Sequence, residues 1–167
     1  LFPNFTVLEN VNIGRHLHAR ETLFGAVFGM SKHMEIENLE KSRKIVDFLG
    51  MTEHQDELAS NLPYGLQRAL NVAIALATEP RLLMLDEPVA GMNPTEKAEM
   101  TRIIRLIRDE MGMTVMLVEH DMRTVMNLCD KITVIDFGEK LAEGLPQEIR
   151  ENKDVIEAYL GAEDIVA

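Results

Sequence analysis

The apolar and polar positions divide the chain into a helical first part and a second part in which strands alternate with helices. Residues 1 to about 60 contain no alternating strand pattern, and their apolar residues follow a helical spacing instead. Between residues 82 and 135, short apolar runs alternate with amphipathic stretches, which is typical of right-handed crossovers in a parallel sheet. The pattern predicts an α/β fold with a parallel sheet core and a helical subdomain.

Local signals predict where the individual elements begin and end. Thr6 and Glu9 have the spacing of a capping box, and Asn93, Pro94 and Glu96 repeat that spacing at a second helix start. The expected elements are helices at 34–50, 67–77 and 95–111, strands at 82–85, 114–118 and 131–137, a short antiparallel return at 140–142, and two small helices near the end of the chain that pack Ile149, Val155, Ile156, Tyr159 and Leu160.

The strand expected at 82–85 ends directly in two acids. Four consecutive apolar residues predict a strand that is buried in a parallel sheet, and the run at 114–118 predicts a second one. Asp86 and Glu87 therefore lie at the carboxyl edge of the sheet, where open α/β sheets bind their ligands. Two interpretations are open at this point: the acids end the strand and cap the next segment, or they hold a cation and act on a water molecule.

Composition narrows the class of protein. The 167 residues suffice for one domain with a small subdomain, and 46% hydrophobic with 27% charged residues is ordinary for a globular protein. No apolar run approaches the roughly 20 residues of a membrane span. Cys129 is the single cysteine, which fits a reducing cytoplasm. A net charge of −11 argues against a nucleic-acid partner.

The two acids are one of four motifs, and the order of these motifs along the chain favours the second interpretation. Tyr64-Gly65 opens an amphipathic helix, Asp86-Glu87 ends a strand, Ala90-Gly91-Met92-Asn93-Pro94 comes next, and Glu119-His120-Asp121 ends the next strand. Together these segments resemble the ATP-binding cassette (ABC) family, with its signature motif, Walker B motif, D-loop and switch histidine. The resemblance covers nearly the whole chain and implies a partial P-loop NTPase fold, that of an ABC ATPase.

The resemblance implies catalytic roles for three residues. Asp86 would hold Mg²⁺ through water, and Glu87 would polarise the water that attacks ATP. His120, one strand further on and at the same sheet edge, would steady the γ-phosphate; a structural role is the alternative for a lone histidine in such a place. ATP and Mg²⁺ are therefore the expected cofactors.

The signature position implies a second set of contacts, to the nucleotide held by a partner subunit. Tyr64 and Gly65 would reach that nucleotide, because a helix N-terminus with glycine amides can approach a phosphate. Pro63, Tyr64 and Leu66 stand where the family carries serine, glycine and glutamine, and Pro63 has neither a hydroxyl nor an N–H for a phosphate. The alternative for Gly65 is an ordinary helix cap. Asn93, which the helix cap already explains, would also lie at the dimer interface.

A phosphate-binding loop is the motif that the chain lacks. The family places G-x-x-x-x-G-K-[ST] ahead of the other motifs, and the sequence contains none. We therefore expect a fragment without the N-terminal third of its domain, inactive as an ATPase by itself. The expected parts are a helical subdomain at 1–79, the C-terminal part of the RecA-like core at 80–145, and a C-terminal helical extension at 146–167.

Two features resemble one branch of the family, the importers of branched-chain amino acids. These are the Tyr-Gly form of the signature motif and the C-terminal extension. The resemblance implies an ATPase that is cytoplasmic and peripheral on the inner face of the membrane. Its partners would be a second ABC ATPase subunit and membrane permease subunits, with no contact to the transported solute. Residues 20–30 are interpreted first as a short packed helix, and the alternative is a permease groove formed by Leu23, Phe24, Val27 and Phe28.

Two other functions are considered. A non-catalytic interaction module would supply a signature face or a dimer surface to an intact ATPase partner. The missing loop favours this function for the chain of 167 residues, whereas Glu87 and His120 favour an ATPase for the complete protein. An ABC-type DNA-repair or chromosome ATPase is disfavoured by the acidic charge and by the absence of coiled-coil heptads.

Overall fold

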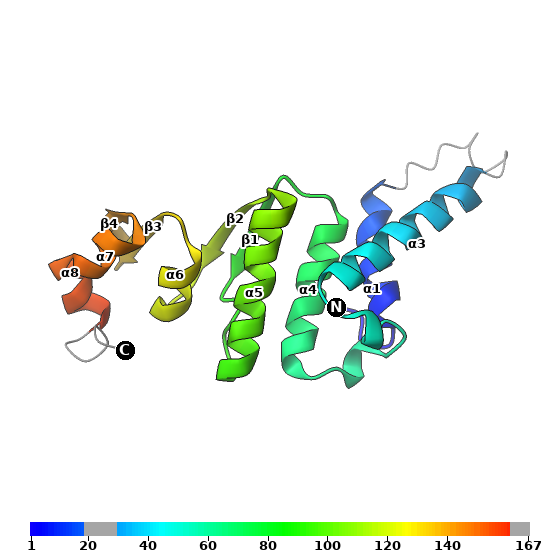
Figure 1. The fold of residues 1–167 in the computed structure, drawn as a ribbon, viewed down its shortest axis with the longest axis horizontal. Coiled ribbons are helices and arrows are strands. Elements are labelled where there is room, and N and C mark those ends of the chain that lie inside the picture. The colour runs from blue at the N-terminus through cyan, green and yellow to red at the C-terminus, as the bar shows by residue number, and fades with distance from the viewer. Residues whose placement is uncertain (19–29, 161–167) are drawn as a thin grey trace. The chain divides into compact units, whose positions relative to one another are not determined.

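The computed structural model describes residues 1–18 and 30–160 (Figure 1). The chain divides into two units. The first unit comprises Leu1–Leu85 and Gly91–Met116, and the second comprises Asp86–Ala90 and the chain from Leu117 onward. The groove residues expected at Leu23, Phe24, Val27 and Phe28 lie outside the described residues. Within residues 1–18 and 30–160, no helix is at once long enough and apolar enough to cross a membrane.

The order of elements follows the predicted change from helices to alternating strands and helices. The elements up to the first strand are α1 (Val7–Gly14), η1 (Arg15–His18), α3 (Met30–Phe48), η2 (Thr52–His54), η3 (Ala59–Asn61) and α4 (Tyr64–Ala77). They are followed by β1 (Leu82–Asp86), α5 (Pro94–Met111), β2 (Thr114–Val118), α6 (Met122–Leu128), β3 (Ile132–Asp136), β4 (Glu139–Gly144), α7 (Pro146–Glu151), α8 (Lys153–Val155) and η4 (Ile156–Leu160).

The helices of the first unit pack around α1, which contacts both α3 and α4. The predicted capping box at Thr6 is confirmed, since its side chain accepts from Glu9 N and the Glu9 side chain accepts from Thr6 N. At the other end of α1, Gly14 permits a close approach to α4. A Cβ at that position would lie 2.5 Å from Ile74 O and 2.8 Å from Ala77 Cβ. The core between these helices is apolar and includes Val7, Val11, Leu70, Ala73 and Leu76.

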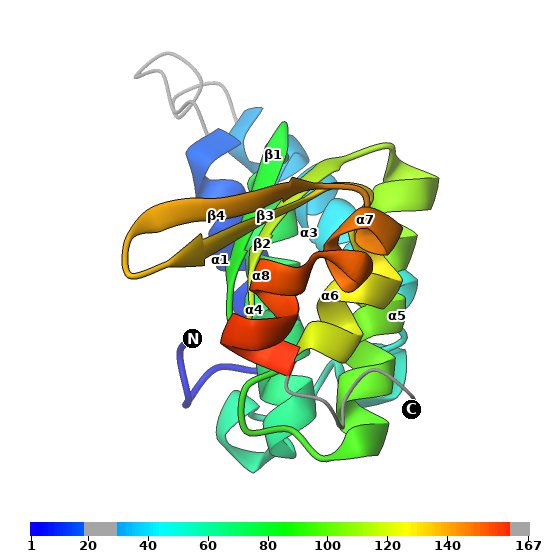
Figure 2. The same ribbon diagram turned by 90° about the vertical axis from the view of Figure 1, so that its left-hand side faces the viewer.

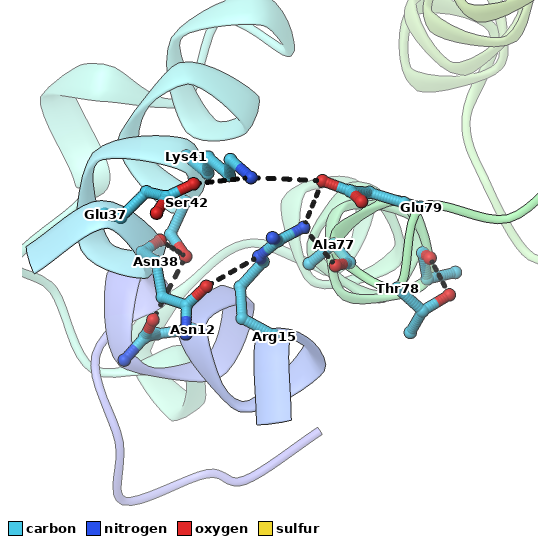
Figure 3. A network of polar contacts seen from close by, with 10 residues as sticks. Asn12, Arg15, Glu37, Asn38, Lys41, Ser42, Ala77, Thr78 and Glu79 are labelled. Atoms are coloured by element: carbon cyan, nitrogen blue, oxygen red, sulfur yellow. Dashed lines mark hydrogen bonds and ion pairs between the residues drawn. The ribbon is translucent and has the colours of Figure 1, made fainter. Parts of the chain in front are cut away.

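A buried arginine ties three of these helical segments together (Figure 3). Arg15 is only 2% exposed. Its guanidinium donates to Ala77 O at 3.1 Å, to Glu79 Oε1 at 2.6 Å and to Asn38 Oδ1 at 3.3 Å. Lys41 adds an ion pair to the same Glu79 oxygen at 3.8 Å. The positive charge lies at the C-terminal end of α4, where the helix dipole favours it.

Helix α5 begins and ends as its sequence predicts. Asn93 is the N-cap and accepts from the backbone N–H groups of Thr95 and Glu96, and Pro94 occupies the first helical position. Gly112 closes the helix in the left-handed conformation, with φ of 61°. The apolar face expected for this helix is buried, and its members are Met100, Ile103, Ile104 and Ile107.

Strands β1 and β2 form a two-stranded parallel sheet, connected through α5. Their carboxyl ends lie side by side, because Glu87 N donates to Val118 O at 2.8 Å. Leu83 is buried as expected. The prediction of burial is wrong for the other face, on which Leu82, Met84, Met116 and Val118 are exposed. Alternate side chains of a strand point to opposite faces, and in the described chain only one face is covered.

The second unit is built on a β-hairpin rather than on a third parallel strand (Figure 2). Strand β3 pairs antiparallel with β4, with partners running from Ile132 and Gly144 to Asp136 and Glu139. The short antiparallel return is thereby confirmed. The expectation that the third strand extends the parallel sheet is wrong for the described residues, in which β3 pairs with β4 only. A tight turn makes the hairpin the nearest available pairing.

The short terminal helices cover one face of this hairpin. The core of the second unit consists of Val125, Ile132, Val134, Ile149 and Val155, with Ile156 packed against it. Packing of Ile149, Val155 and Ile156 is therefore confirmed. Tyr159 was expected in the same core, but it is exposed, and its hydroxyl donates to Ile135 O at 2.5 Å. The Leu160 side chain lies outside the described residues.

Candidate functional site

The two acids at the end of β1 occupy a tight turn with a strained backbone. Glu87 adopts a positive φ of 44°, which a residue with a long side chain rarely adopts. Its N–H donates to Val118 O, and its carbonyl accepts from Ala90 N at 3.1 Å, so hydrogen bonds on both sides hold it in this conformation. Such a conformation costs of order 1–3 kcal/mol and is concentrated at functional sites. Glu79 and Phe137 also have positive φ, so the strain agrees with the predicted role of Glu87 but does not assign it.

His120 faces Glu87 from the loop after β2. Its Nδ1 lies 3.0 Å from Glu87 Oε1, and both side chains are more than half exposed. An ionised carboxylate only accepts hydrogen bonds, so the hydrogen of this contact is on Nδ1, and Nε2 is left to face solvent or a ligand. The structure therefore brings together two residues for which the motif order predicts a catalytic role.

Glu119 is part of the same cluster, although its sequence position predicted no role for it. Its Oε1 accepts from Val89 N at 3.0 Å, and its Oε2 accepts from His120 N at 3.1 Å and from Asp121 N at 3.4 Å. Asp121 in turn caps α6 by accepting from Thr124 N at 2.9 Å. An acid between a strand and His120 was visible in the sequence, but its partner Val89 lies 30 residues away, and no local signal indicates that contact.

Asp86 is the residue for which the resemblance predicts a divalent cation. Its carboxylate is exposed and has no hydrogen bond or ion pair within residues 1–18 and 30–160. In the same residues, no group of three or more histidine, cysteine or acidic side chains is arranged to hold a metal. Mg²⁺ is commonly held by one or two carboxylates, with water and nucleotide phosphate as its other ligands. Asp86 thus offers one carboxylate of the kind that Mg²⁺ takes as a ligand, and its role in binding Mg²⁺ stays a prediction.

Within the first unit, the turn that opens α4, where the signature motif is predicted, packs against Gly91. The Tyr64 ring lies over Gly91, where an added Cβ would be 3.6 Å from the ring carbon Cε1 and from the hydroxyl oxygen. Arg68 holds the ring by a hydrogen bond from its Nε to the hydroxyl at 2.9 Å and by a cation–π contact. Gly65 N donates to Glu96 Oε1 at 3.3 Å. Pro63, the N-cap of α4, makes no side-chain capping bond.

Asn93 lies in the same region, and its side chain is engaged in capping α5. Glu96 accepts from Asn93 N at 3.0 Å as well as from Gly65 N, so one carboxylate joins Gly65 to the start of α5. The structure thus brings Tyr64, Gly65 and Asn93 into one cluster in the first unit. Glu87 and His120 form a separate cluster in the second.

Fold and motif order define the class of protein. The ABC transporter family matches residues 1–90, which is more than half of the chain. The chain therefore belongs to the ABC transporter family. A second family, described as branched-chain amino acid ATP-binding cassette transporter, matches residues 139–165. The resemblance stated from the sequence is confirmed.

The relatives are consistent with one branch of this family. The chain is 41% identical over 163 residues to the high-affinity branched-chain amino acid transport ATP-binding protein LivG of Salmonella typhimurium. It is 40% identical over the same length to the corresponding protein BraF of Pseudomonas aeruginosa. Each match covers 96% of this chain, which spans 64% of the length of these curated relatives.

Solved structures confirm the predicted fold class. The ADP conformation of MJ1267, an ATP-binding cassette of an ABC transporter, superposes with a TM-score of 0.76 at 28% identity. A nucleotide-free ATP-binding cassette from an ABC transporter gives 0.75 at 27% identity. Each comparison covers 96% of this chain and 64% of the solved chain. The chain therefore has the fold of an ABC ATPase cassette.

Proposed function

We propose that this chain is part of an ATP-hydrolysing subunit of an ABC importer for branched-chain or related amino acids. The pairing of His120 with the strained Glu87 carries the hydrolytic part of the proposal. The match of residues 139–165 to the branched-chain amino acid family, together with the LivG and BraF relatives, supports the class of solute. In this proposal the division by role is a helical subdomain at 1–79, core at 80–145 and a C-terminal extension at 146–167.

The residues at the end of β1 would carry out the chemistry. Mg²⁺, held by Asp86, would neutralise charge on the nucleotide phosphates when bound. Glu87 would orient the attacking water and accept its proton, a task for which a fixed carboxylate is suited. His120 would steady the γ-phosphate through Nε2, because its Nδ1 is directed to Glu87. The exposure of both side chains leaves room for a nucleotide to approach.

The first unit would act on the nucleotide of a second ATPase subunit. Tyr64 and Gly65 lie at the N-terminus of α4, whose dipole favours a phosphate, and Asn93 would lie at the dimer interface. The partners are then a second ABC ATPase subunit and membrane permease subunits. The protein would be peripheral on the inner face of the membrane, without contact to the solute.

A second candidate function is a non-catalytic module that lends its signature face to an intact partner. The 167 residues contain no G-x-x-x-x-G-K-[ST] segment, and this observation favours that candidate for the isolated chain. Without backbone amides to cradle the β-phosphate, we expect the isolated chain to have little or no ATPase activity.

Titration calorimetry with Mg·ATP distinguishes the two candidates. The chain of 167 residues is compared with a longer chain that includes a phosphate loop upstream of Leu1. Binding and hydrolysis by the longer chain alone, with hydrolysis abolished by Glu87→Gln, support the proposal. Binding by the short chain contradicts the roles assigned above, since the nucleotide would then be held by other groups. Binding without hydrolysis by the longer chain supports the non-catalytic module.

A further inference from the structure

One carboxylate connects the two loops that carry Glu87 and His120. Glu119 accepts three backbone N–H groups, one from Val89 in the loop after β1 and two from its own loop after β2. Val89 is two residues beyond Glu87 and is buried, with 1% exposure. His120 comes directly after Glu119. The backbone on both sides of the Glu87–His120 contact is therefore anchored on the same side chain.

Helix capping does not explain this arrangement. Asp121 is the N-cap of α6 and satisfies Thr124 N without help from Glu119. The contact between Glu119 and Val89 joins segments 30 residues apart and contributes nothing to any helix end. It joins the loop of Glu87 to the loop of His120, in addition to the bond from Glu87 N to Val118 O. Charge-assisted bonds to backbone N–H groups are the stronger kind of hydrogen bond and suit such a task.

The hydrogen bonds of Glu119 matter because the backbone of Glu87, in the neighbouring loop, is strained. A residue with φ of 44° relaxes unless its surroundings hold it. The N–H of Glu87 is held by Val118 O, and the turn after it is held at Val89 by Glu119. We infer that Glu119 is a positioning residue, which keeps the Glu87 carboxylate against His120; its importance for hydrolysis rests on the function proposed above.

A glutamate side chain is required at position 119 to accept all three hydrogen bonds. Both oxygens of Glu119 accept from N–H donors, and an amide offers one oxygen and one NH₂ group that cannot accept. Glu119→Gln therefore loses the bond to Val89 or the bonds to His120 and Asp121. Glu119→Asp keeps the charge but is one methylene shorter, so it cannot reach both loops. Glu148→Gln is the matched control, because Glu148 also accepts a backbone N–H, that of Leu145 at 2.7 Å, in the same unit.

The first test reports the surroundings of the His120 imidazole and does not depend on ATPase activity. The chain has five histidines, and the imidazole NMR signal of His120 is identified by its loss in His120→Ala. We expect Glu119→Gln and Glu119→Asp to move this signal away from its position in the parent chain, and Glu148→Gln to leave it in place. An unmoved signal in folded Glu119→Gln overturns the inference, whatever the protein does with ATP.

The second test measures hydrolysis by the complete subunit assembled with its permease. Glu119→Gln is expected to lower kcat about 10- to 100-fold, the range for a small misplacement of catalytic groups, with KM for ATP unchanged. In a His120→Ala background the same substitution should have a much smaller effect, because the two act through one contact. Fully additive losses overturn the inference. If His120→Ala alone leaves hydrolysis intact, the proposed function fails, while the NMR result for Glu119 still stands.

Discussion

Gly65 and Glu96 are in direct contact, with the backbone N–H of Gly65 donating to Glu96 Oε1 at 3.3 Å. The other oxygen of this carboxylate accepts from Asn93 N at 3.0 Å. Little space separates the two residues, since a Cβ at position 65 would lie 3.0 Å from Glu96 Cγ. One side chain therefore joins the first turn of α4 to the cap of α5.

Replacement of Glu96 by glutamine should loosen this connection. The amide has one accepting oxygen for two N–H donors, so we expect Glu96→Gln to lower the free energy of unfolding by about 1 kcal/mol. Glu110→Gln is the control for the change of net charge. Glu110 is exposed at the other end of the same helix, where the dipole disfavours an acid, so its replacement should not lower the free energy of unfolding. Urea unfolding measures both variants. Equal losses would show that charge alone, and not the contact with Gly65 and Asn93, is responsible.

Arg15 should be a main contributor to the stability of the first unit. Arg15→Ala removes charged donors from Ala77 O, Asn38 Oδ1 and Glu79. We expect a loss of about 2–3 kcal/mol, the range for hydrogen bonds from a charged group. Arg43→Ala, at an exposed position of α3, should change the free energy of unfolding by less than about 0.5 kcal/mol. Thermal and urea unfolding provide the comparison, and similar losses in both variants would contradict a special role for Arg15.

Replacement of Glu87 by glycine should abolish hydrolysis without destabilising the fold. Glycine adopts positive φ without strain, so Glu87→Gly should relieve about 1–3 kcal/mol of strain in the folded state. Two costs oppose this relief: about 0.4–1 kcal/mol from the greater freedom of glycine in the unfolded chain, and less than about 1 kcal/mol from the exposed contact to His120. We therefore expect a variant about as stable as the parent, in which hydrolysis by the complete subunit is lost.

Phe137→Gly is the control for the effect of glycine at a backbone position with positive φ. Phe137 has the same φ of 44° and is fully exposed at the hairpin turn. It should gain stability and keep hydrolysis. A clear loss of stability in Glu87→Gly alone would mean that the Glu87 side chain stabilises the fold.

Glu143 should make stability depend on pH in the acid range. A hydrogen bond from Lys131, and then one from Lys140, lower the pKa of Glu143 from 4.5 to about 2. Because the folded-state pKa is the lower one, the stabilisation is fully present above pH 4.5 and is lost as the pH falls toward 2.

The comparison with Glu143→Gln tests this assignment. The difference in unfolding free energy between the parent and this variant should shrink steadily between pH 4.5 and 2. Glu139→Gln, which removes an exposed acid from the same strand, is the control for the change of net charge. A constant difference for Glu143→Gln across this range would contradict the assigned pKa.

Helix ends were the most predictable part of this protein. The capping boxes of Thr6 with Glu9 and of Asn93 with Glu96 depend on residues three positions apart, and both are present. The change from helices to strands at residue 82 was visible for the same reason, because periodicity is a local property. The order of the motifs also placed Glu87 and His120 at the ends of neighbouring strands, where they are in contact.

Contacts between distant segments were not predictable. The apolar runs of β1 and β2 indicated burial on both faces, yet Met84 and Met116 are exposed, because a run of apolar residues does not specify how many layers cover it. Nothing near Arg15 indicated that it is buried against Ala77 and Glu79, more than 60 residues away. The role of Glu119 was equally hidden, because its partner Val89 lies on the loop after the neighbouring strand.

The sequence by itself determined the helix ends, the two acids after β1 and the family to which the chain belongs, since each depends on residue types at short fixed spacings. Only the tertiary structure decided which carboxylates accept hydrogen bonds and from which groups. It directs Glu87 to His120, Glu119 to the backbone of two loops and Glu96 to Gly65. These choices depend on how parallel strands and helix ends are brought together in space, because hydrogen bonds form only within about 3 Å and with suitable direction.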